Sequence, residues 1–309
     1  MKTITTFLVA AFMLAFTAAH SQDTYQPATD STGLPGDHFS LQGALDLFKS
    51  SQSLEEFEQK LNTESNYVNN LDLDGDGIID YISVSDKMEG TSHAIVLQIA
   101  ISETESQDIA VIGIEKSGNE TAVLQIIGDE ELYGDSTIVE PFEVSTDKGG
   151  KGGGFGPDPV VLEQNIIIVN VWMWPCVKFI YAPKYKPWVS PWHYRHHPSW
   201  FKPWKPAPWY VHHNHCIHHH ANYHPVYIYR VPVAHKIYKP YHKSSVIIIN
   251  KYKPAHAAYK AHHAGKPHKN PNAGKHQGTP KNQGQKGNPP NNKGQGKGNP
   301  NPGGKKGGK

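Results

Sequence analysis

The chain has 309 residues and a formal net charge of only +2, but its charge is strongly divided along the sequence. Residues 22–150 contain 26 acidic residues and 5 lysines, whereas residues 151–309 contain 24 lysines and arginines and 2 acidic residues. The two cysteines, Cys176 and Cys216, are too few for a disulfide-stapled scaffold, so folding needs a hydrophobic core or a metal; one disulfide between them is left open.

The first 21 residues have the pattern of a signal peptide. Lys2 precedes an apolar run, residues 7–19, that is too short to span a bilayer, and Ala19 and Ser21 suit a cleavage site. We therefore expect an exported protein of the periplasm, cell surface or medium; an uncleaved membrane anchor is the alternative. Residues 22–38 are polar and rich in proline and glycine, which predicts a flexible leader.

Residues 39–147 are predicted to form an acidic α+β domain. Ser40 and Ser53 are suited to cap helices over residues 41–50 and 54–62, each of which carries an apolar face. Four β-type runs follow at residues 78–84, 94–101, 109–115 and 122–127. Their short connections favour antiparallel hairpins. The expected fold is therefore one or two helices packed on a four-stranded antiparallel meander whose other face is open to water.

Composition changes sharply beyond this domain. Residues 148–158 form a glycine-rich linker, and residues 159–263 are rich in proline, tryptophan, histidine and tyrosine. Because proline blocks helices and removes sheet donors, we expect this basic region to be largely disordered with short strands, although its apolar runs also allow it to pack on the acidic domain. Residues 264–309, composed mainly of glycine, asparagine, proline and lysine, are predicted to be a disordered tail.

The clearest chemical motif is an aspartate-rich loop of the kind that binds calcium. Asp72, Asp74, Asp76 and Asp80 occupy positions 1, 3, 5 and 9, and Gly77 permits the sharp turn. An EF-hand is excluded because Ser83 stands where a bidentate glutamate is needed and a strand follows in place of a helix. We expect a structural Ca²⁺ at the helix-to-strand junction; the alternative is an acidic hairpin entry without an ion.

Residues 72–84 resemble the calcium loops of thrombospondin type 3 repeats, dockerins and FG-GAP (VCBS) repeats, in the last of which a strand also follows the loop. More broadly, residues 70–77, 93–98, 107–111 and 127–134 resemble a type of uncharacterised secreted protein from Bacteroidota. The first resemblance implies a calcium site in a single short segment, and the second implies a surface or periplasmic location without an activity.

A histidine cluster supplies a second candidate metal site. Neutral imidazole and thiolate groups suit zinc, copper or nickel, but no CxxC or HExxH spacing is present. A pH-responsive polar segment is the alternative interpretation. The candidate ligands are His212, His213, His215, Cys216, His218, His219, His220 and His224.

All seven tryptophans lie between Trp172 and Trp209, among lysine, arginine and histidine. Such a mixture suits anionic envelope polymers or membrane surfaces, and it also permits docking on the acidic domain; no specific nucleic-acid binding is expected. The sequence contains neither a GxSxG motif nor the histidine spacing of zincins, so no motif in it indicates an enzyme. We therefore expect a non-enzymatic envelope or surface protein for binding or structure. A periplasmic protein that binds or sequesters Zn²⁺, Cu²⁺ or Ni²⁺ is the alternative.

Overall fold

The computed structural model describes residues 31–144 and 166–264, which build an α+β fold around an antiparallel sheet. The strands run in the order β1–β2–β3–β4–β5, and β5 pairs in addition with β7 through residues 138–141 and with β6 through residues 142–144. The strands are β1 (Ile82–Glu89), β2 (Ser92–Ala100), β3 (Ser106–Gly118), β4 (Thr121–Gly128), β5 (Ile138–Val144), β6 (Ile166–Ile168) and β7 (Tyr223–Val226). The meander of β1 to β4 was expected, whereas β5 to β7 extend it.

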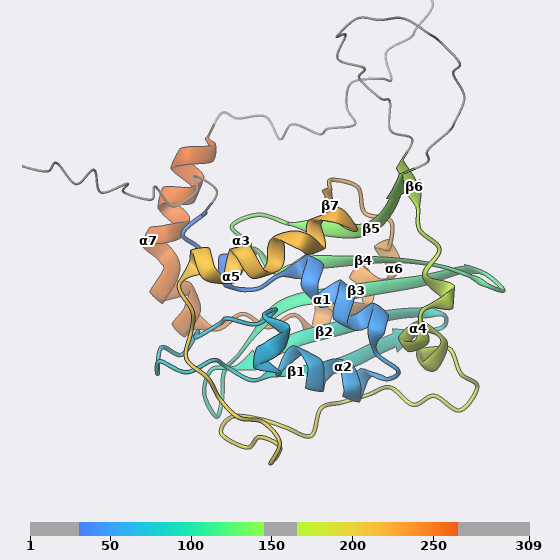
Figure 1. Ribbon diagram of the computed structural model, residues 1–309, viewed down its shortest axis with the longest axis horizontal. Coiled ribbons are helices and arrows are strands. Elements are labelled where there is room, and N and C mark those ends of the chain that lie inside the picture. Colours follow the sequence, from blue (N-terminus) through green and yellow to red (C-terminus); the bar gives the residue numbers. More distant parts are fainter. Residues whose placement is uncertain (1–30, 145–165, 265–309) are drawn as a thin grey trace, which may run out of the picture. The chain divides into compact units, whose positions relative to one another are not determined.

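Helices precede, connect and follow the strands (Figure 1). The α-helices are α1 (Leu41–Ser50), α2 (Leu54–Leu61), α3 (Glu130–Tyr133), α4 (Pro175–Ile180), α5 (Trp209–Cys216), α6 (Pro232–Tyr238) and α7 (Val246–His263). Short 3₁₀ helices are η1 (Pro35–His38), η2 (Glu64–Asn66), η3 (Val171–Met173), η4 (Ile217–Ala221) and η5 (Lys239–Tyr241). The predicted caps are confirmed, since Ser40 Oγ accepts from Gly43 N and Ser53 Oγ accepts from Glu56 N. More helices are present than the one or two expected.

Both faces of the sheet are covered, so the prediction of one water-exposed face was wrong. On one face α1, α2 and α4 bury residues such as Phe48 and Phe57 against the sheet. On the other face α6 covers Val96 and Val111, and Figure 1 shows this helix behind the strands. Strands that are buried on both sides need apolar residues at successive positions, and the uninterrupted run from Ala94 to Leu97 provides them.

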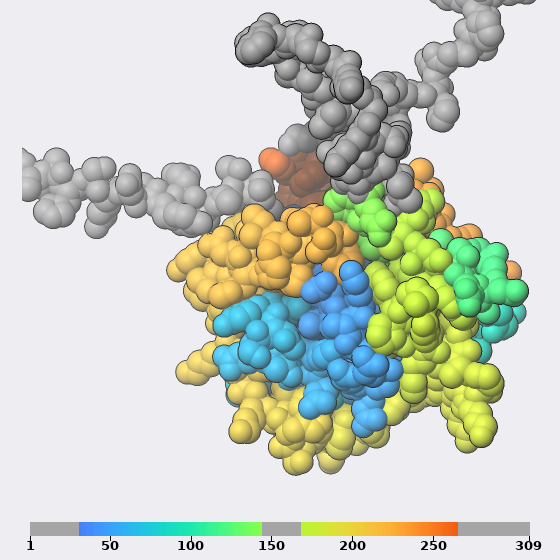
Figure 2. Space-filling view, turned by 45° about the vertical axis from the view of Figure 1, so that its right-hand side comes forward, coloured from blue at the N-terminus to red at the C-terminus, as the bar shows by residue number. Residues whose placement is uncertain are grey.

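The prediction of a largely disordered basic region was wrong for residues 166–263. The basic segment, defined here as residues 166–264, contains four α-helices and two strands and belongs to the same compact unit as the acidic residues. Figure 2 shows its yellow to orange surface surrounding the blue surface of α1 and α2. Pro175 and Pro232 occupy the first positions of α4 and α6, where no helical N–H bond is required, whereas Pro254 lies inside α7.

Other boundaries also differ from expectation. Two apolar runs of the basic region, where short strands were expected, are helical: residues 177–182 lie mostly in α4, and residues 246–250 begin α7. Residues 31–38 of the expected leader are ordered: η1 forms there and Leu34 is buried. The signal peptide, the linker and residues 265–309 of the tail lie outside the described residues. Within the described ranges, no helix combines the length and apolar character that a membrane crossing requires.

Candidate metal sites and the buried acid–donor contacts

The aspartate-rich loop lies between η2 and β1 and is closed by its own backbone. Asp80 N donates to Leu71 O at 2.8 Å, and Asn69 Nδ2 donates to Asp80 O at 2.9 Å. Gly75 and Gly77 have positive φ values of 82° and 85°, a conformation that glycine adopts without steric cost. Because Ile78 N, Ile79 N and Asp80 N bond within the loop or to Trp204 O, β1 begins at Ile82 and not at Ile78 as predicted.

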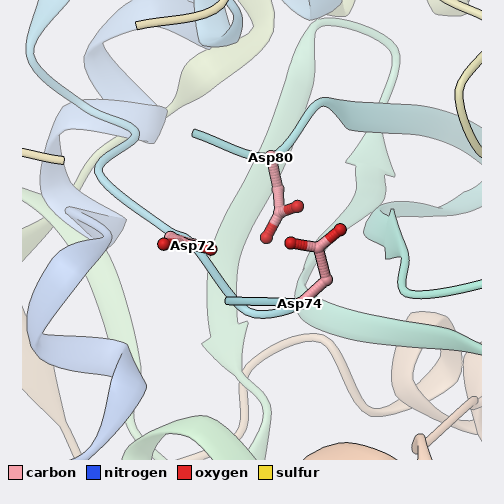
Figure 3. Close-up of side chains that lie close together, drawn as sticks. All are labelled: Asp72, Asp74 and Asp80. Carbon is pink, nitrogen blue, oxygen red and sulfur yellow. The ribbon is translucent and has the colours of Figure 1, made fainter. Parts of the chain in front are cut away.

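Three of the four predicted aspartates converge. Asp72, Asp74 and Asp80 each offer a carboxylate oxygen, and these oxygens lie within 4.8 Å of one another. Figure 3 shows the carboxylates of Asp74 and Asp80 facing each other, with Asp72 beside them. Asp76 is outside this group, and its Oδ1 accepts from Ile78 N at 2.9 Å. Oxygens at this spacing suit a hard cation such as Ca²⁺.

The local electrostatics disfavour three ionised carboxylates without a cation. Burial raises the pKa of Asp80 to about 8, and the negative charges of Asp74, Asp72 and Asp76 add to this effect. The hydrogen bond that Asp80 accepts from Leu73 N lowers the pKa and partly offsets the rise. Burial also raises the pKa of Asp74, with smaller contributions from its acidic neighbours. A divalent ion among the oxygens would offset both the desolvation and the mutual repulsion.

The loop also contacts the basic segment at three points. Ile79 N donates to Trp204 O at 2.8 Å. The Asn70 side chain exchanges two hydrogen bonds with the backbone of Ala207, at 2.7 and 2.8 Å. Lys251 on α7 donates from Nζ to Leu73 O at 2.7 Å. The candidate calcium loop is therefore a junction between the acidic and basic parts of the fold.

The histidine cluster is divided by the structure. His212, His213, Cys216 and His220 line one cavity of about 170 Å³, and His212 and Cys216 are 4 % and 5 % exposed. Burial lowers the pKa of His212 to about 4, which keeps its imidazole neutral, and raises the pKa of the Cys216 thiol to about 11.

The other four histidines do not line that cavity. His215 stacks on Tyr67, with ring centroids 3.9 Å apart. His219 Nδ1 lies 3.6 Å from Asp46 Oδ2, and His218 packs on His219. His224 Nε2 lies 4.0 Å from a Glu140 carboxylate oxygen. The candidate set of eight ligands therefore reduces to four that face a common space.

The two cysteines are free and buried in different places. Cys176 belongs to the main core beside α1, whereas Cys216 ends α5. The disulfide that the sequence leaves open is not formed in this structure. Burial raises the pKa of Cys176, so this thiol stays protonated and packs as a small apolar side chain.

Sequence reasoning missed four buried carboxylates that accept hydrogen bonds from the basic segment. Each of these acidic residues is at most 3 % exposed. Glu58 on α2 accepts from Ser190 Oγ at 2.7 Å and from Trp188 Nε1 at 3.1 Å. The remaining pairs are Asp86 with Tyr185, Asp108 with Tyr238, and Glu140 with Arg230. Of these four carboxylates, Glu140 pairs with a cation, whereas the other three accept from neutral hydroxyl or indole donors of the basic segment.

One serine–histidine–aspartate grouping also occurs where the basic segment meets the acidic part of the fold. Asp129 Oδ2 lies 2.5 Å and Ser244 Oγ 3.4 Å from His242, but both approach the same nitrogen, Nε2. A catalytic triad needs the acid and the nucleophile on different ring nitrogens. The hydrogen bond to Asp129 raises the pKa of His242 and so favours the protonated imidazole, and the contact links the basic segment to the N-cap of α3.

No protein-family model matches the chain, and neither a curated protein nor a solved structure is significantly similar to it.

Proposed function

We propose that this chain is an exported, non-enzymatic structural or binding protein of the cell envelope, stiffened by one Ca²⁺ in the aspartate-rich loop. The observation that carries the proposal is the convergence of Asp72, Asp74 and Asp80 at the junction with the basic segment. The signal-peptide pattern of residues 1–21 supports export. The resemblance of residues 72–84 to known calcium loops supports the choice of ion.

The role of the ion follows from the contacts of the loop. Ca²⁺ takes six to eight oxygen ligands, so backbone carbonyls and water would complete the shell that the three aspartates begin. Fixing the loop in this way also fixes the groups that bond Trp204, Ala207 and Lys251. The ion would therefore hold the basic segment against the sheet.

The ordered basic segment still leaves cationic groups for an anionic partner. Its aromatic rings contribute less than the sequence suggests, because Trp174 is buried and Trp172 and Trp188 pack on the main core. Apart from Lys251, which bonds the aspartate-rich loop, the exposed lysines are Lys178, Lys184, Lys186, Lys202, Lys205, Lys236, Lys239, Lys243, Lys253 and Lys260. We propose that these residues attach the protein to anionic envelope polymers or to a membrane surface, through a contact that weakens as salt rises.

Calcium binding is tested by isothermal titration calorimetry on the chelator-treated full chain. We expect one site in the wild-type protein and no measurable site in Asp74→Asn, because the substitution removes one of the three converging carboxylates. Glu89→Gln is the control, since Glu89 is an exposed carboxylate at the tip of the β1–β2 hairpin. Equal calcium affinity in Asp74→Asn and the wild type would overturn the assignment.

The surface contact is tested by retention on immobilised anionic polysaccharide over a salt gradient. The wild type should elute later than Lys184→Glu/Lys186→Glu, and both should elute earlier as salt rises. Addition of Ca²⁺ to the Asp74→Asn variant separates the two parts of the proposal, because retention through lysines does not require an occupied loop. Salt-independent retention, or retention unaffected by the lysine substitutions, would refute the anionic-surface proposal.

A further inference from the structure

The cavity between α5, η4 and the start of α1 is lined by two buried groups, the thiol of Cys216 and the imidazole of His212. Cys216 Sγ lies 3.8 Å from His212 Nε2 and 3.9 Å from Nδ1, and both residues are almost completely buried. They are four residues apart in one helix, which places them on the same face. The thiol donates to Tyr67 O at 3.2 Å. A sulfur and a nitrogen at this separation approximate two corners of a tetrahedral zinc site, whose bonds are about 2.0–2.3 Å long.

Two further imidazoles, which are less buried, also line this cavity. His213 is next to His212 in α5, and His220 reaches the cavity from η4. Their ring centroids are 6.4 Å apart, with the planes nearly perpendicular at 82°. His213 is half-buried and stacks on Trp209, with ring centroids 5.0 Å apart, whereas His220 is exposed. His212 and Cys216 are thus held by close packing, and the exposed ring of His220 is the least constrained of the four groups.

The acidic residue at the cavity wall is already engaged. The carboxylate of Asp37 accepts hydrogen bonds from Thr32 N at 2.8 Å, Thr32 Oγ1 at 2.9 Å and Gly33 N at 3.0 Å, and thereby holds the turn before η1. The donor set that faces the space is therefore one sulfur and three imidazoles. Such a set suits borderline and soft transition metals and not calcium or magnesium.

We propose that Cys216, His212, His213 and His220 bind one transition-metal ion, such as Zn²⁺, in this cavity. Binding replaces the S–H bond of Cys216 by a sulfur–metal bond and releases the proton to solvent. Among the described residues only the three loop aspartates already place their ligand atoms within 4.8 Å of one another, so the proposed site closes by rotation of the histidine rings. The cavity of about 170 Å³ accommodates the ion together with a water ligand.

The proposal is tested on the full chain by competition between the protein and a chromophoric chelator for Zn²⁺, in excess Ca²⁺ so that the aspartate loop is not the zinc site. We expect one tight site in the wild type, weakened by more than about 100-fold in Cys216→Ser, since loss of a partner that merely orients a ligand already costs 10–100-fold. His220→Asn should also weaken binding, and because His220 is exposed this variant should fold as the wild type does. His218→Asn, an exposed neighbour that does not line the cavity, should bind as the wild type does.

Cobalt substitution gives an independent readout of the sulfur ligand. Co²⁺ bound by Cys216 should produce a thiolate-to-cobalt charge-transfer band in the near ultraviolet, present in His218→Asn and lost in Cys216→Ser. Weak binding of several ions that falls equally in His218→Asn and His220→Asn would show a histidine tract without a defined site. A tight site without the charge-transfer band would exclude the sulfur, and either result overturns the proposal.

Discussion

Replacement of Glu58 tests whether the buried carboxylates hold the basic segment in place. Glu58 Oε2 accepts two N–H groups, from Val84 N and Trp188 Nε1, both at 3.1 Å. Its Oε1 accepts two hydroxyl groups, from Tyr81 at 2.8 Å and Ser190 at 2.7 Å. Glu58→Ala leaves the two N–H donors without an acceptor, and each such loss costs roughly 1–3 kcal/mol. We therefore expect the free energy of unfolding to fall by about 2–6 kcal/mol.

Glu58→Gln distinguishes hydrogen bonding from charge. The amide oxygen can take the place of Oε2, and the amide NH₂ can take the place of Oε1, because the hydroxyls of Tyr81 and Ser190 can rotate to accept. This variant should lose only about 1 kcal/mol. Urea denaturation followed by tryptophan fluorescence measures all three proteins. Glu55→Ala, an exposed change on the same helix, is the control and should stay within about 0.5 kcal/mol of the wild type.

The same pair of variants predicts a pH dependence. Burial raises the pKa of Glu58 above its ordinary value of 4.5, against the lowering effect of its hydrogen bonds. The folded chain therefore holds this proton to a higher pH than the unfolded chain, so stability falls as pH rises from about 4.5 towards the folded-state pKa. Glu58→Gln should lack that part of the fall. Equal losses of stability in Glu58→Ala and Glu58→Gln, with parallel pH profiles, would refute the reasoning.

Three further predictions concern the opposite face of the sheet. Tyr238→Phe removes the hydroxyl that donates to Asp108 Oδ2 at 2.9 Å, and should lower the unfolding free energy by about 1–2 kcal/mol in urea denaturation; no change would contradict a buried bond. Gly113→Ala would place a methyl group 2.7 Å from Val231 Cγ2, so calorimetry should show a loss of about 1–3 kcal/mol, and an unaltered melting temperature would argue against close packing of α6. A chain ending at residue 147 uncovers the apolar face under α6, so it should bind the dye ANS and melt without a cooperative transition; cooperative melting without dye binding would show that the acidic part folds alone.

The sequence predicts the local elements of the acidic part well. Ser40 and Ser53 mark the helix starts because a capping hydroxyl is a local signal, and the hairpins of β1 to β4 follow from short turns between apolar runs. The aspartate loop is likewise local, since its three converging carboxylates lie within nine residues. Contacts between residues close in sequence are the ones that spacing alone can reveal.

The basic segment was misjudged because its order depends on distant partners. Its proline-rich sequence satisfies no local pattern, and its tyrosine hydroxyls donate to carboxylates more than 90 residues away, as Tyr185 does to Asp86. Two signals were present in the sequence. Glu58 stands on the apolar face of α2 between Leu54 and Leu61, and Asp86 continues the inward alternation of β1. A carboxylate at a core position requires a donor, and the basic segment is where the chain supplies one.

The histidine cluster shows the same limit. Spacing places His212 and Cys216 on one helical face, but only the fold shows that His215 turns to Tyr67 and His219 to Asp46. Both side chains are drawn away from the shared cavity by partners in the acidic part. The four residues that stay around the cavity are therefore a product of tertiary packing and not of the sequence pattern alone.

Thermal melting of the full chain with calcium and with chelator tests the central claim most directly. At free Ca²⁺ about 100 times its Kd, binding adds about 2.7 kcal/mol, which corresponds to a rise in Tm of roughly 5–10 °C. The account predicts this rise in the wild type, its loss in Asp74→Asn, and slower proteolysis of the basic segment around Trp204 and Ala207 when calcium is present. An identical Tm with calcium and with chelator would contradict a structural calcium at the junction of the acidic and basic parts.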